Sequence, residues 1–481
     1  MLSSNNPALT KIANNALVWL RRDLRAHDHR PLSEAVHFGT KVQHVFVFDT
    51  TILNKLDEKK DRRVEFIHAS LVELEATLTA AGGTLVVLHG DPSVLIPQFC
   101  QQHGINTVYT ARDVEPSAVA RDQAVLTKLS LQGVQWHALD DHTVVPVDEI
   151  LQPKSTPYVV FTPYSKRWFT VLDNHIADAS VNLNAVAWMA IPGGVPSLQH
   201  IGFAPAGNKA LGFLAGESGA NVFWKDFKRR ITLYDTARDF PSVKGTSYLS
   251  VHFRFGTISA RQCVRELRAL MSTNSGITTW VKELAWRDFY AQLLHHFPYT
   301  ATSAFQVRYD NLVWNNDPAL LAAWEDGKTG YPLVDAAQRQ ILATGFMHNR
   351  LRMVTASFFT KHLGLDWRVG EAFFAKHLND YDMASNIGGW QWAASTGSDA
   401  QPYFRVFNPT LQSEKFDAKG KFIRRYCPEL VKVPDSCIHT PWLMTPEQQE
   451  ESGCIIGRDY PAPIVEHKTA RDEAIARFKT A

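Results

Sequence analysis

The stretch WVKELAWRDFY (280–290) combines residue types that can hold and orient a polar ligand. Glu283 and Arg287 are four residues apart, as are Trp286 and Tyr290. On a helix, a carboxylate, a guanidinium and two aromatic rings would therefore share one face. An exposed salt bridge beside a core tryptophan has the same spacing and contributes little free energy. The spacing alone favours this second interpretation.

Two later stretches repeat the mixture of polar and bulky residues. In GFMHNRLRM (345–353), an amide, a cation and a thioether fall at helical spacing, at Asn349, Arg352 and Met353. In NDYDMASNIGGWQWAASTG (379–397), a polar group precedes an expected Gly-Gly turn and two tryptophans. Paired carboxylates can serve acid/base catalysis or a metal, and they can equally cap a helix or bind a polar ligand. The polar group is Asp380, Asp382 and Asn386, and the tryptophans are Trp390 and Trp392.

Three common motifs are incomplete in this sequence. Gly327-Lys328-Thr329 resembles the end of a phosphate-binding loop, but Ala322 stands where that loop requires glycine. The turn after the first apolar run carries arginines and no GxGxxG pattern, which argues against nicotinamide dinucleotide binding. His295-His296 lacks HExxH spacing, so we expect surface or hydrogen-bonded histidines and no metal site.

The N-terminal third of the chain alternates apolar runs with amphipathic stretches. A helix is predicted where apolar residues recur every three or four positions from Val64 to Leu78, and Gly82-Gly83 is expected to end it. Alternating strands and helices predict an α/β domain with a doubly wound parallel sheet over residues 16–147. Its strands are expected at 16–20, 42–48, 84–88 and 105–110.

The pattern changes beyond this domain. Residues 148–210 are rich in proline and show little periodicity, which predicts a connector laid over the surface. Over 211–470, strand-like runs vanish, helical patterns dominate and tryptophan becomes dense. We therefore expect an all-helical second domain. Its aromatic residues could simply form a bulky core.

The bulk composition excludes several classes of protein. With 45% hydrophobic and 20% charged residues, the 481-residue chain is globular and long enough for two or three domains. No apolar run reaches the roughly 18 residues of a membrane span, and residues 1–15 lack the apolar core of a secretory signal. The five cysteines form no CxxC pair. A cytoplasmic protein without membrane association is expected.

Together with four other stretches, these three clusters resemble the class I cyclobutane pyrimidine dimer photolyases of the photolyase/cryptochrome family. The similarity extends over roughly residues 16–468, and the order and intervals of the motifs also match. It implies an α/β antenna domain followed by an all-helical domain that binds FAD. The other stretches are VWLRRDLRAHDHRPL (18–32), RDFPSVKGTSYLS (238–250), GKTGYPLVDAAQRQ (327–340) and YFRVFNPTLQSEKFD (403–417).

The resemblance implies a flavin site in the helical domain. Hydroxyls and backbone N–H groups of the 246–250 turn suit phosphate oxygens. An Arg352–Asp380 pair would place positive charge beside the reduced, anionic ring, and the Asn386 amide would face the flavin N5. The residues implied to bind FAD are Tyr234, Thr246, Ser247, Tyr248, Leu249, Ser250, Trp280, Arg287, Asn349, Arg352, Asp380, Asp382 and Asn386.

The resemblance also implies an electron path and a surface for damaged DNA. Trp390, Trp367 and Trp314 match the family's chain of tryptophans from flavin to surface. Trp286 and Trp392 match aromatic walls that stack against a flipped pyrimidine dimer. Basic residues within 403–425 predict phosphate contacts. The implied catalytic residues are Trp314, Trp367, Trp390, Asn386 and Glu283, and the implied DNA and lesion contacts are Arg238, Glu283, Trp286, Tyr290, Asn349, Arg350, Met353, Trp392, Arg405 and Gln412.

The implied activity is light-dependent repair of cyclobutane pyrimidine dimers in UV-damaged DNA by a monomeric deoxyribodipyrimidine photo-lyase. Reduced FAD would lend an electron to the lesion and recover it, with no net redox change. The alternative is a cryptochrome-type blue-light signalling flavoprotein. Asn386 favours repair, because many signalling relatives carry Asp or Cys at that position. Repair of (6-4) photoproducts is disfavoured, because the two histidines typical of those relatives correspond to Asn349 and Met353.

The antenna chromophore is the part of the resemblance that stays open. Glu115 matches a residue that holds reduced folate in folate-binding relatives. The Cys-Lys pair that also contacts folate there corresponds to Ala301-Thr302 in this chain. This mismatch argues against methenyltetrahydrofolate and leaves a deazaflavin, a second flavin or an empty site open.

Overall fold

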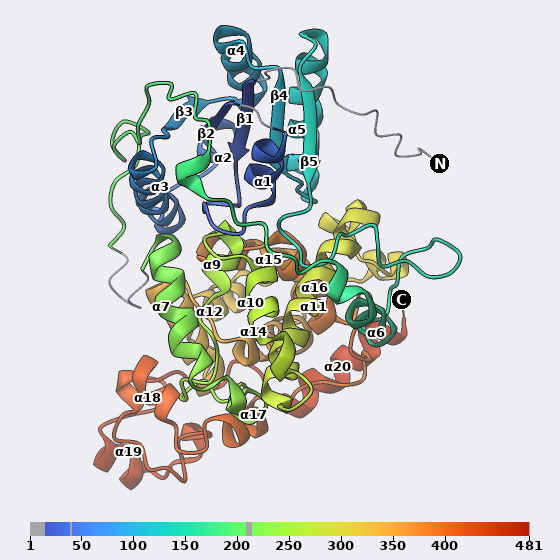
Figure 1. Ribbon diagram of the computed structural model, residues 1–481. Coiled ribbons are helices and arrows are strands. Elements are labelled where there is room, and N and C mark those ends of the chain that lie inside the picture. Colours follow the sequence, from blue (N-terminus) through green and yellow to red (C-terminus); the bar gives the residue numbers. More distant parts are fainter. Residues whose placement is uncertain (1–14, 39–40, 208–213, 481) are drawn as a thin grey trace. The chain divides into compact units, whose positions relative to one another are not determined.

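The computed structural model describes residues 15–38, 41–207 and 214–480 (Figure 1). Within these ranges, the chain forms two compact units whose segments alternate along the sequence. The α/β unit comprises residues up to Pro146 together with 171–223 and 249–268. The helical unit comprises 147–170, 224–248 and the chain from 269 onward. Residues 1–14, nearly all of the stretch in which the sequence shows no secretory signal, lie outside the described residues.

The α/β unit is built on a five-stranded parallel sheet of order β3-β2-β1-β4-β5. This confirms the predicted fold class and the four predicted strands. The edge strand β5 was not predicted, because its sequence QWHAL is partly exposed and lacks the apolar run of the inner strands. The strands are β1 (Asn15–Leu20), β2 (Lys41–Asp49), β3 (Leu85–Gly90), β4 (Thr107–Ala111) and β5 (Gln135–Leu139).

Helices cover both faces of this sheet. Side chains of β1 alternate between two apolar cores, with Val18 and Leu20 in one and Leu17 and Trp19 in the other. Helices α1 and α3 contribute to the first core, and α4 and α5 contribute to the second. The helices of this unit are α1 (Arg30–His37), α2 (Thr50–Leu53), α3 (Arg62–Ala80), α4 (Pro92–His103), α5 (Pro116–Leu131), α9 (Ser250–Phe255) and α10 (Ala260–Leu267), and α7 (Gly216–Lys228) begins here and ends in the helical unit.

Helix α3 shows how local sequence sets an element's ends. Its N-cap residue is Asp61, whose carboxylate accepts hydrogen bonds from the N–H groups of Arg63 at 2.8 Å and Val64 at 3.3 Å. The helix ends at Ala80, and Gly82 follows with a φ of +83°. Both the predicted helix and its predicted stop are confirmed.

The helical unit has an apolar core of its own and, within its described residues, no extended strand. Helix α16 packs against α11, α14 and α15. Helix α6 lies within the stretch 148–210 that was expected to be a connector. The helices of this unit are α6 (Phe161–Val171), α8 (Tyr234–Ala237), α11 (Ser275–His296), α12 (Pro318–Glu325), α13 (Pro332–Thr344), α14 (Asn349–Ser357), α15 (Trp367–His377), α16 (Met383–Ala394), α17 (Pro409–Phe416), α18 (Lys421–Tyr426), α19 (Pro446–Ser452) and α20 (His467–Lys479).

The length and apolarity of the helices bear on whether any could cross a lipid bilayer. In the described part of the chain, none combines the length and the apolarity that crossing a bilayer requires.

Candidate functional site

A cavity of about 460 Å³ lies within the helical unit, between α11, α14, α16 and the segment that follows α8. Its walls bring together side chains that are far apart in the sequence. Six further residues that were not among the predicted site residues also line it, namely Asp239, Ala356, Phe374, Leu378, Ser385 and Gly389. The predicted site residues that line this cavity are Tyr234, Arg238, Thr246, Glu283, Trp286, Arg287, Tyr290, Asn349, Arg350, Arg352, Met353, Asp380, Asp382, Asn386, Trp390 and Trp392.

Other predicted residues lie elsewhere. Trp280 packs in the core, with its ring centroid 5.3 Å from that of Trp224. Tyr248 has a φ of +56°, which is a left-handed turn conformation. Leu249 and Ser250 begin α9, which belongs to the α/β unit. The predicted residues that are not part of the cavity wall are Trp280, Trp314, Trp367, Ser247, Tyr248, Leu249, Ser250, Arg405 and Gln412, together with Glu115 of the α/β unit.

Helix α11 supplies the first wall of the cavity. Glu283 forms an ion pair with Arg238, and both side chains are about one-third exposed. Burial raises the pKa of the Glu283 carboxyl above its ordinary value, and the positive charge of Arg238 opposes this rise. Trp286 lies further along the same face, and its ring centroid is 5.5 Å from that of Tyr290. The predicted shared face of this helix therefore exists and points at the cavity.

Helix α14 supplies the second wall, and a histidine begins it. His348 is its N-cap residue, and the ring Nδ1 accepts a hydrogen bond from the Arg350 N–H at 3.1 Å. Four residues later, the Arg352 guanidinium binds Asp380 through both carboxylate oxygens, at 2.8 and 3.0 Å. The Asp380 side chain is only 6% exposed. The predicted Arg352–Asp380 pair is therefore confirmed as a contact.

Helix α16 supplies the third wall and corrects one expectation. Gly388 and Gly389 were predicted to form a turn, but both lie inside this helix. A methyl group at Gly388 would come within 2.1 Å of the Tyr290 ring, so glycine is needed for α16 to approach α11. At Gly389 a methyl group would meet nothing within 4 Å, which leaves this part of the cavity wall open. Asp382 caps the helix, accepting from the Ser385 N–H at 3.0 Å.

Asn386 is held by a residue that the sequence analysis missed. Its amide nitrogen donates to the Glu371 backbone carbonyl at 3.2 Å and to the Glu371 carboxylate at 2.9 Å. The pKa of Glu371 is raised by burial, while hydrogen bonds from Asn386 and Tyr381 oppose the rise. Glu371 lies on a neighbouring helix, and no local pattern connects it to Asn386. In the sequence, Glu371 is four residues after the predicted site residue Trp367, so the two would share a helix face.

The three tryptophans of the predicted electron path lie in or against one core. Trp390 and Trp367 are almost fully buried in it, and Trp314 packs against it. The Trp390 ring lies so close to α15 that a methyl group at Gly370 would come within 2.1 Å of it. Trp324 also contacts Trp390, with ring centroids 6.1 Å apart in a T-shaped arrangement. This aromatic core extends from the cavity wall at Trp390 into the unit.

The chemistry of the cavity suits a large ligand with both polar and flat parts. The Thr246 hydroxyl oxygen and the Trp390 indole nitrogen are buried and have no hydrogen-bond partner among the described residues. Both residues line the cavity, and buried polar groups normally have partners. Guanidinium, carboxylate and amide groups lie beside aromatic rings in the same space. These residues fit a phosphorylated, ring-containing cofactor such as FAD.

Comparisons with known proteins match nearly the whole chain. The model for DNA photolyase matches residues 16–181, and the model for the FAD binding domain of DNA photolyase matches residues 280–480. A deoxyribodipyrimidine photo-lyase of Alkalihalophilus pseudofirmus is 37% identical over 96% of this chain and 97% of its own length. The Escherichia coli deoxyribodipyrimidine photo-lyase is 37% identical over 97% and 98%. This chain belongs to the DNA photolyase family.

Solved structures confirm that the chain has the photolyase/cryptochrome fold. A bacterial class III photolyase from Agrobacterium tumefaciens has a TM-score of 0.88 and 33% identity, covering 99% of both chains. A cryptochrome from Synechocystis has a TM-score of 0.86 and 27% identity, covering 98% of this chain and 100% of its own. An archaeal photolyase from Sulfolobus tokodaii, described with two FAD molecules, has a TM-score of 0.79 and 29% identity, covering 97% and 100%.

Glu115 of the α/β unit forms ion pairs with two arginine side chains. Its carboxylate accepts from Arg22 at 2.9 Å and from Arg254 at 2.6 Å. Arg22 also binds Asp113 at 3.2 Å, and nearby cations, Arg22 foremost, hold the pKa of the Asp113 carboxyl well below its usual range in spite of burial. An antenna molecule that contacts Glu115 would therefore meet a neutralised carboxylate.

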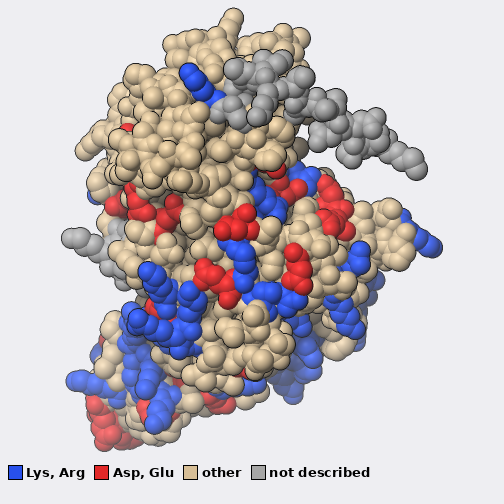
Figure 2. Space-filling model, in the orientation of Figure 1, with Lys and Arg blue, Asp and Glu red and all other residues tan. Residues whose placement is uncertain are grey.

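Positively charged side chains are concentrated on the helical unit near α18. Figure 2 shows Lys and Arg side chains clustered over this helix. Arg405, Lys415 and Arg425 are exposed, whereas Arg424 is engaged by Asp435 at 2.8 Å. A local basic surface therefore exists even though the whole chain has a net charge of only +2.

Proposed function

We propose that this chain repairs cyclobutane pyrimidine dimers in DNA with light as the energy source. The observation that carries the proposal is the cavity in the helical unit. One part of its wall holds the Arg352–Asp380 pair, and another part holds the lesion-reading candidates Trp286 and Met353. A cofactor and a flipped pyrimidine dimer could therefore lie beside one another in this cavity. The relatives named deoxyribodipyrimidine photo-lyase, which match over nearly their full length, support the same activity.

The cavity residues divide into two groups by chemistry. Arg352 and Asp380 would hold the ring system and favour its negative charge, and Thr246 and Arg287 would bind phosphate and other polar groups. Asn386, oriented by Glu371, would present its carbonyl oxygen to the ring. Reduced FAD, when bound and excited, supplies the electron that opens the cyclobutane ring. The protein provides placement and charge rather than a strong acid or base.

The second group would receive the flipped pyrimidine dimer. Trp286 and Trp392 offer flat surfaces, and stacking a base on such a ring contributes about 1–3 kcal/mol. That contribution would help offset the unstacking of the flipped bases. Asn349 and Met353 line the cavity on the same helix and would contact the base edges. Exposed basic residues, including Arg405, would bind the phosphates outside the cavity.

Purified protein with chemically reduced flavin should be irradiated with thymine-dimer DNA, and dimer loss should be compared with a dark sample. Repair that depends on light supports the proposal. If the protein binds FAD and absorbs blue light but leaves the dimers intact, the cryptochrome-type signalling alternative is supported. The Trp286→Ala variant is the matched control, because it should bind FAD normally while its repair is slowed. The antenna chromophore, the monomeric state and the cytoplasmic location stay predictions.

A further inference from the structure

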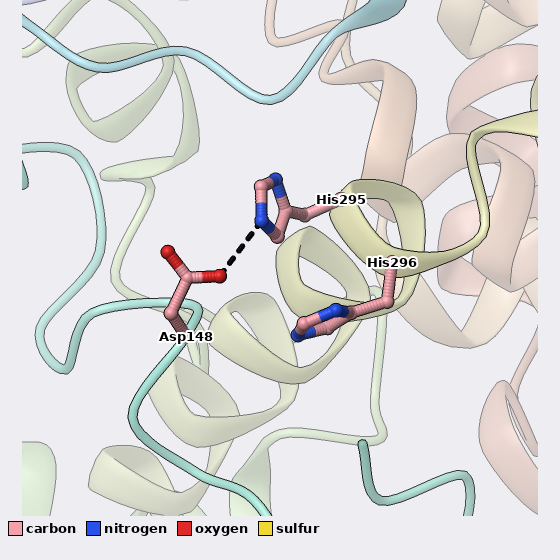
Figure 3. A group of neighbouring side chains, drawn as sticks. All are labelled: Asp148, His295 and His296. Carbon is pink, nitrogen blue, oxygen red and sulfur yellow. Dashed lines mark hydrogen bonds and ion pairs between the residues drawn. The ribbon is translucent and has the colours of Figure 1, made fainter. Parts of the chain in front are cut away.

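Two imidazoles and one carboxylate converge at the end of α11, outside the flavin cavity. The residues are Asp148, His295 and His296, and one potential ligand atom from each lies within 4.8 Å of the other two. Figure 3 shows the Asp148 carboxylate directed at His295, with the ring of His296 beside it. The His295 Nε2 and Asp148 Oδ1 atoms are 2.8 Å apart. None of these three residues lines the cavity described above.

The backbone brings the two histidines together. They are the last two residues of α11, and their rings are 4.9 Å apart at 70° to one another. The C-terminus of a helix carries partial negative charge, which favours a bound cation. Asp148 comes from the segment 147–170, at the start of the helical unit. The side chains of His295 and Asp148 are 31% and 50% exposed, so an ion from solvent can reach them.

We propose that Asp148, His295 and His296 form a binding site for a divalent transition-metal ion, of which Zn²⁺ is the representative. Two imidazole nitrogens and one carboxylate oxygen suit Zn²⁺, Co²⁺ or Ni²⁺ and are a poor set for Mg²⁺ or Ca²⁺, which prefer oxygen ligands. Water would complete the coordination. The His295 Nε2 and Asp148 Oδ1 atoms are 2.8 Å apart, the distance of a hydrogen bond. Two ligand atoms about 2.0–2.1 Å from a tetrahedral zinc ion are roughly 3.3 Å apart, so these two side chains would separate slightly to admit the ion.

A second cluster with the same residue types differs in its burial. Asp23, His29 and Asp141 also converge, deep in the α/β unit. There Asp141 is bound by Arg25 at 2.5 Å and by Arg261 at 2.8 Å. These guanidinium groups already neutralise the carboxylates and would repel a metal ion. In the cluster at the end of α11, Asp148 is exposed and both histidines are half-buried.

A metal ion at this site would join segment 147–170 to α11. That segment contains α6, and α11 carries Glu283 and Trp286 of the cavity wall. Because the ion would bind the folded protein and not the dispersed ligands of the unfolded chain, it would stabilise the helical unit. The inference does not depend on the proposed repair activity.

The test is a titration of tag-free, full-length, metal-stripped protein with Zn²⁺ by calorimetry and with Co²⁺ by visible absorption. We expect one equivalent of Zn²⁺ to bind, a rise in Tm on its addition, and the absorption of Co²⁺ with nitrogen and oxygen ligands. Asp148→Asn and His295→Gln should each weaken Zn²⁺ binding about tenfold or more, because each removes one of three protein ligands. His200→Gln, which changes an exposed histidine outside the cluster, should bind Zn²⁺ like the parent protein.

Two results would overturn the proposal. One is the absence of a stoichiometric Zn²⁺ complex in the parent protein. The other is equal Zn²⁺ affinity in the parent protein and in the Asp148→Asn/His295→Gln double variant. The Tm of each variant without metal shows that it folds, and dimer repair measured on the same samples reports separately on the proposed function.

Discussion

The phenyl ring of Phe161 stacks face to face on the indole of Trp286, with ring centroids 3.6 Å apart and ring planes 9° apart. Phe161 begins α6, and its N–H donates to the carboxylate of Asp399 at 3.0 Å. The Ser398 hydroxyl also donates to the Val159 carbonyl just before this helix. A stretch that the sequence presents as a connector therefore fixes the plane of an aromatic wall of the cavity.

We expect Phe161→Ala to weaken binding to dimer-containing DNA. The substitution removes the ring that packs on one face of Trp286 and lets the Trp286 ring tilt. The flipped pyrimidine dimer would then stack on a less ordered surface. Aromatic pairs contribute about 0.5–1.5 kcal/mol beyond burial, which corresponds to roughly 2–10-fold in affinity. Titrations with dimer-containing and undamaged duplexes measure the effect. Phe161→Tyr keeps the ring and should bind like the parent protein; equal weakening for both duplexes would contradict the role.

The pair Arg352–Asp380 should be far more important for the cofactor than the neighbouring pair Arg350–Asp239. Arg352→Gln leaves a carboxylate that is 6% exposed without its cation, and breaking such a pair costs about 3 kcal/mol or more. Arg350→Gln frees Asp239, which is 37% exposed, at a cost below about 1 kcal/mol. Bound FAD per chain and Tm should fall markedly in the first variant only. Similar losses in both variants would show that the Arg352 pair has no special role.

Replacing Trp390 with Phe should separate two activities of the flavin. Trp390 connects the cavity wall to the buried aromatic core, and phenylalanine is much harder to oxidise than tryptophan. We expect Trp390→Phe to lose most photoreduction of oxidised FAD, measured by absorption under blue light. Dimer repair should stay near the parent level once the flavin is reduced chemically. A parallel loss in both assays would mean that Trp390 is needed for folding or cofactor placement instead.

Mild acid should destabilise the helical unit through His348. Burial, aided by the nearby Arg350 and Arg352, lowers the pKa of His348 to about 4, although Asp239 opposes the shift. The unfolded chain takes up a proton near pH 6.5 and the folded chain near pH 4, so stability is full above pH 6.5 and falls as the pH drops toward 4. The slope attributable to this group is at most about 1.4 kcal/mol per pH unit. Protonation would also remove the Nδ1 acceptor that caps α14.

His348→Asn provides the matched variant for this pH dependence. Asparagine is a good N-cap residue and does not titrate, so the helix cap is kept while the proton uptake is removed. Chemical denaturation at several pH values between 4 and 7.5 should show a shallower loss of stability in the variant. Identical slopes in the two proteins would assign the acid sensitivity to another group.

Features that depend on local spacing could be predicted from the sequence alone. Residues three and four apart share a helix face whatever the surroundings, so the shared faces of α11 and α14 could be predicted from 280–290 and 345–353. Alternating strands and helices likewise predicted the parallel sheet. The resemblance of the motifs to a known family pointed to most of the side chains that line the cavity.

Contacts between residues that are far apart in the sequence could be seen only in the folded structure. The Phe161–Trp286 stack and the Glu371–Asn386 hydrogen bonds join different elements, and no periodicity in the sequence connects them. The Gly388-Gly389 pair was predicted to be a turn because glycine often ends a helix. The pair lies within α16. There, packing against Tyr290 leaves no room for a side chain at Gly388, which explains the glycine at this position. Contacts between elements are set by the packing of the whole core, and single segments do not contain that information.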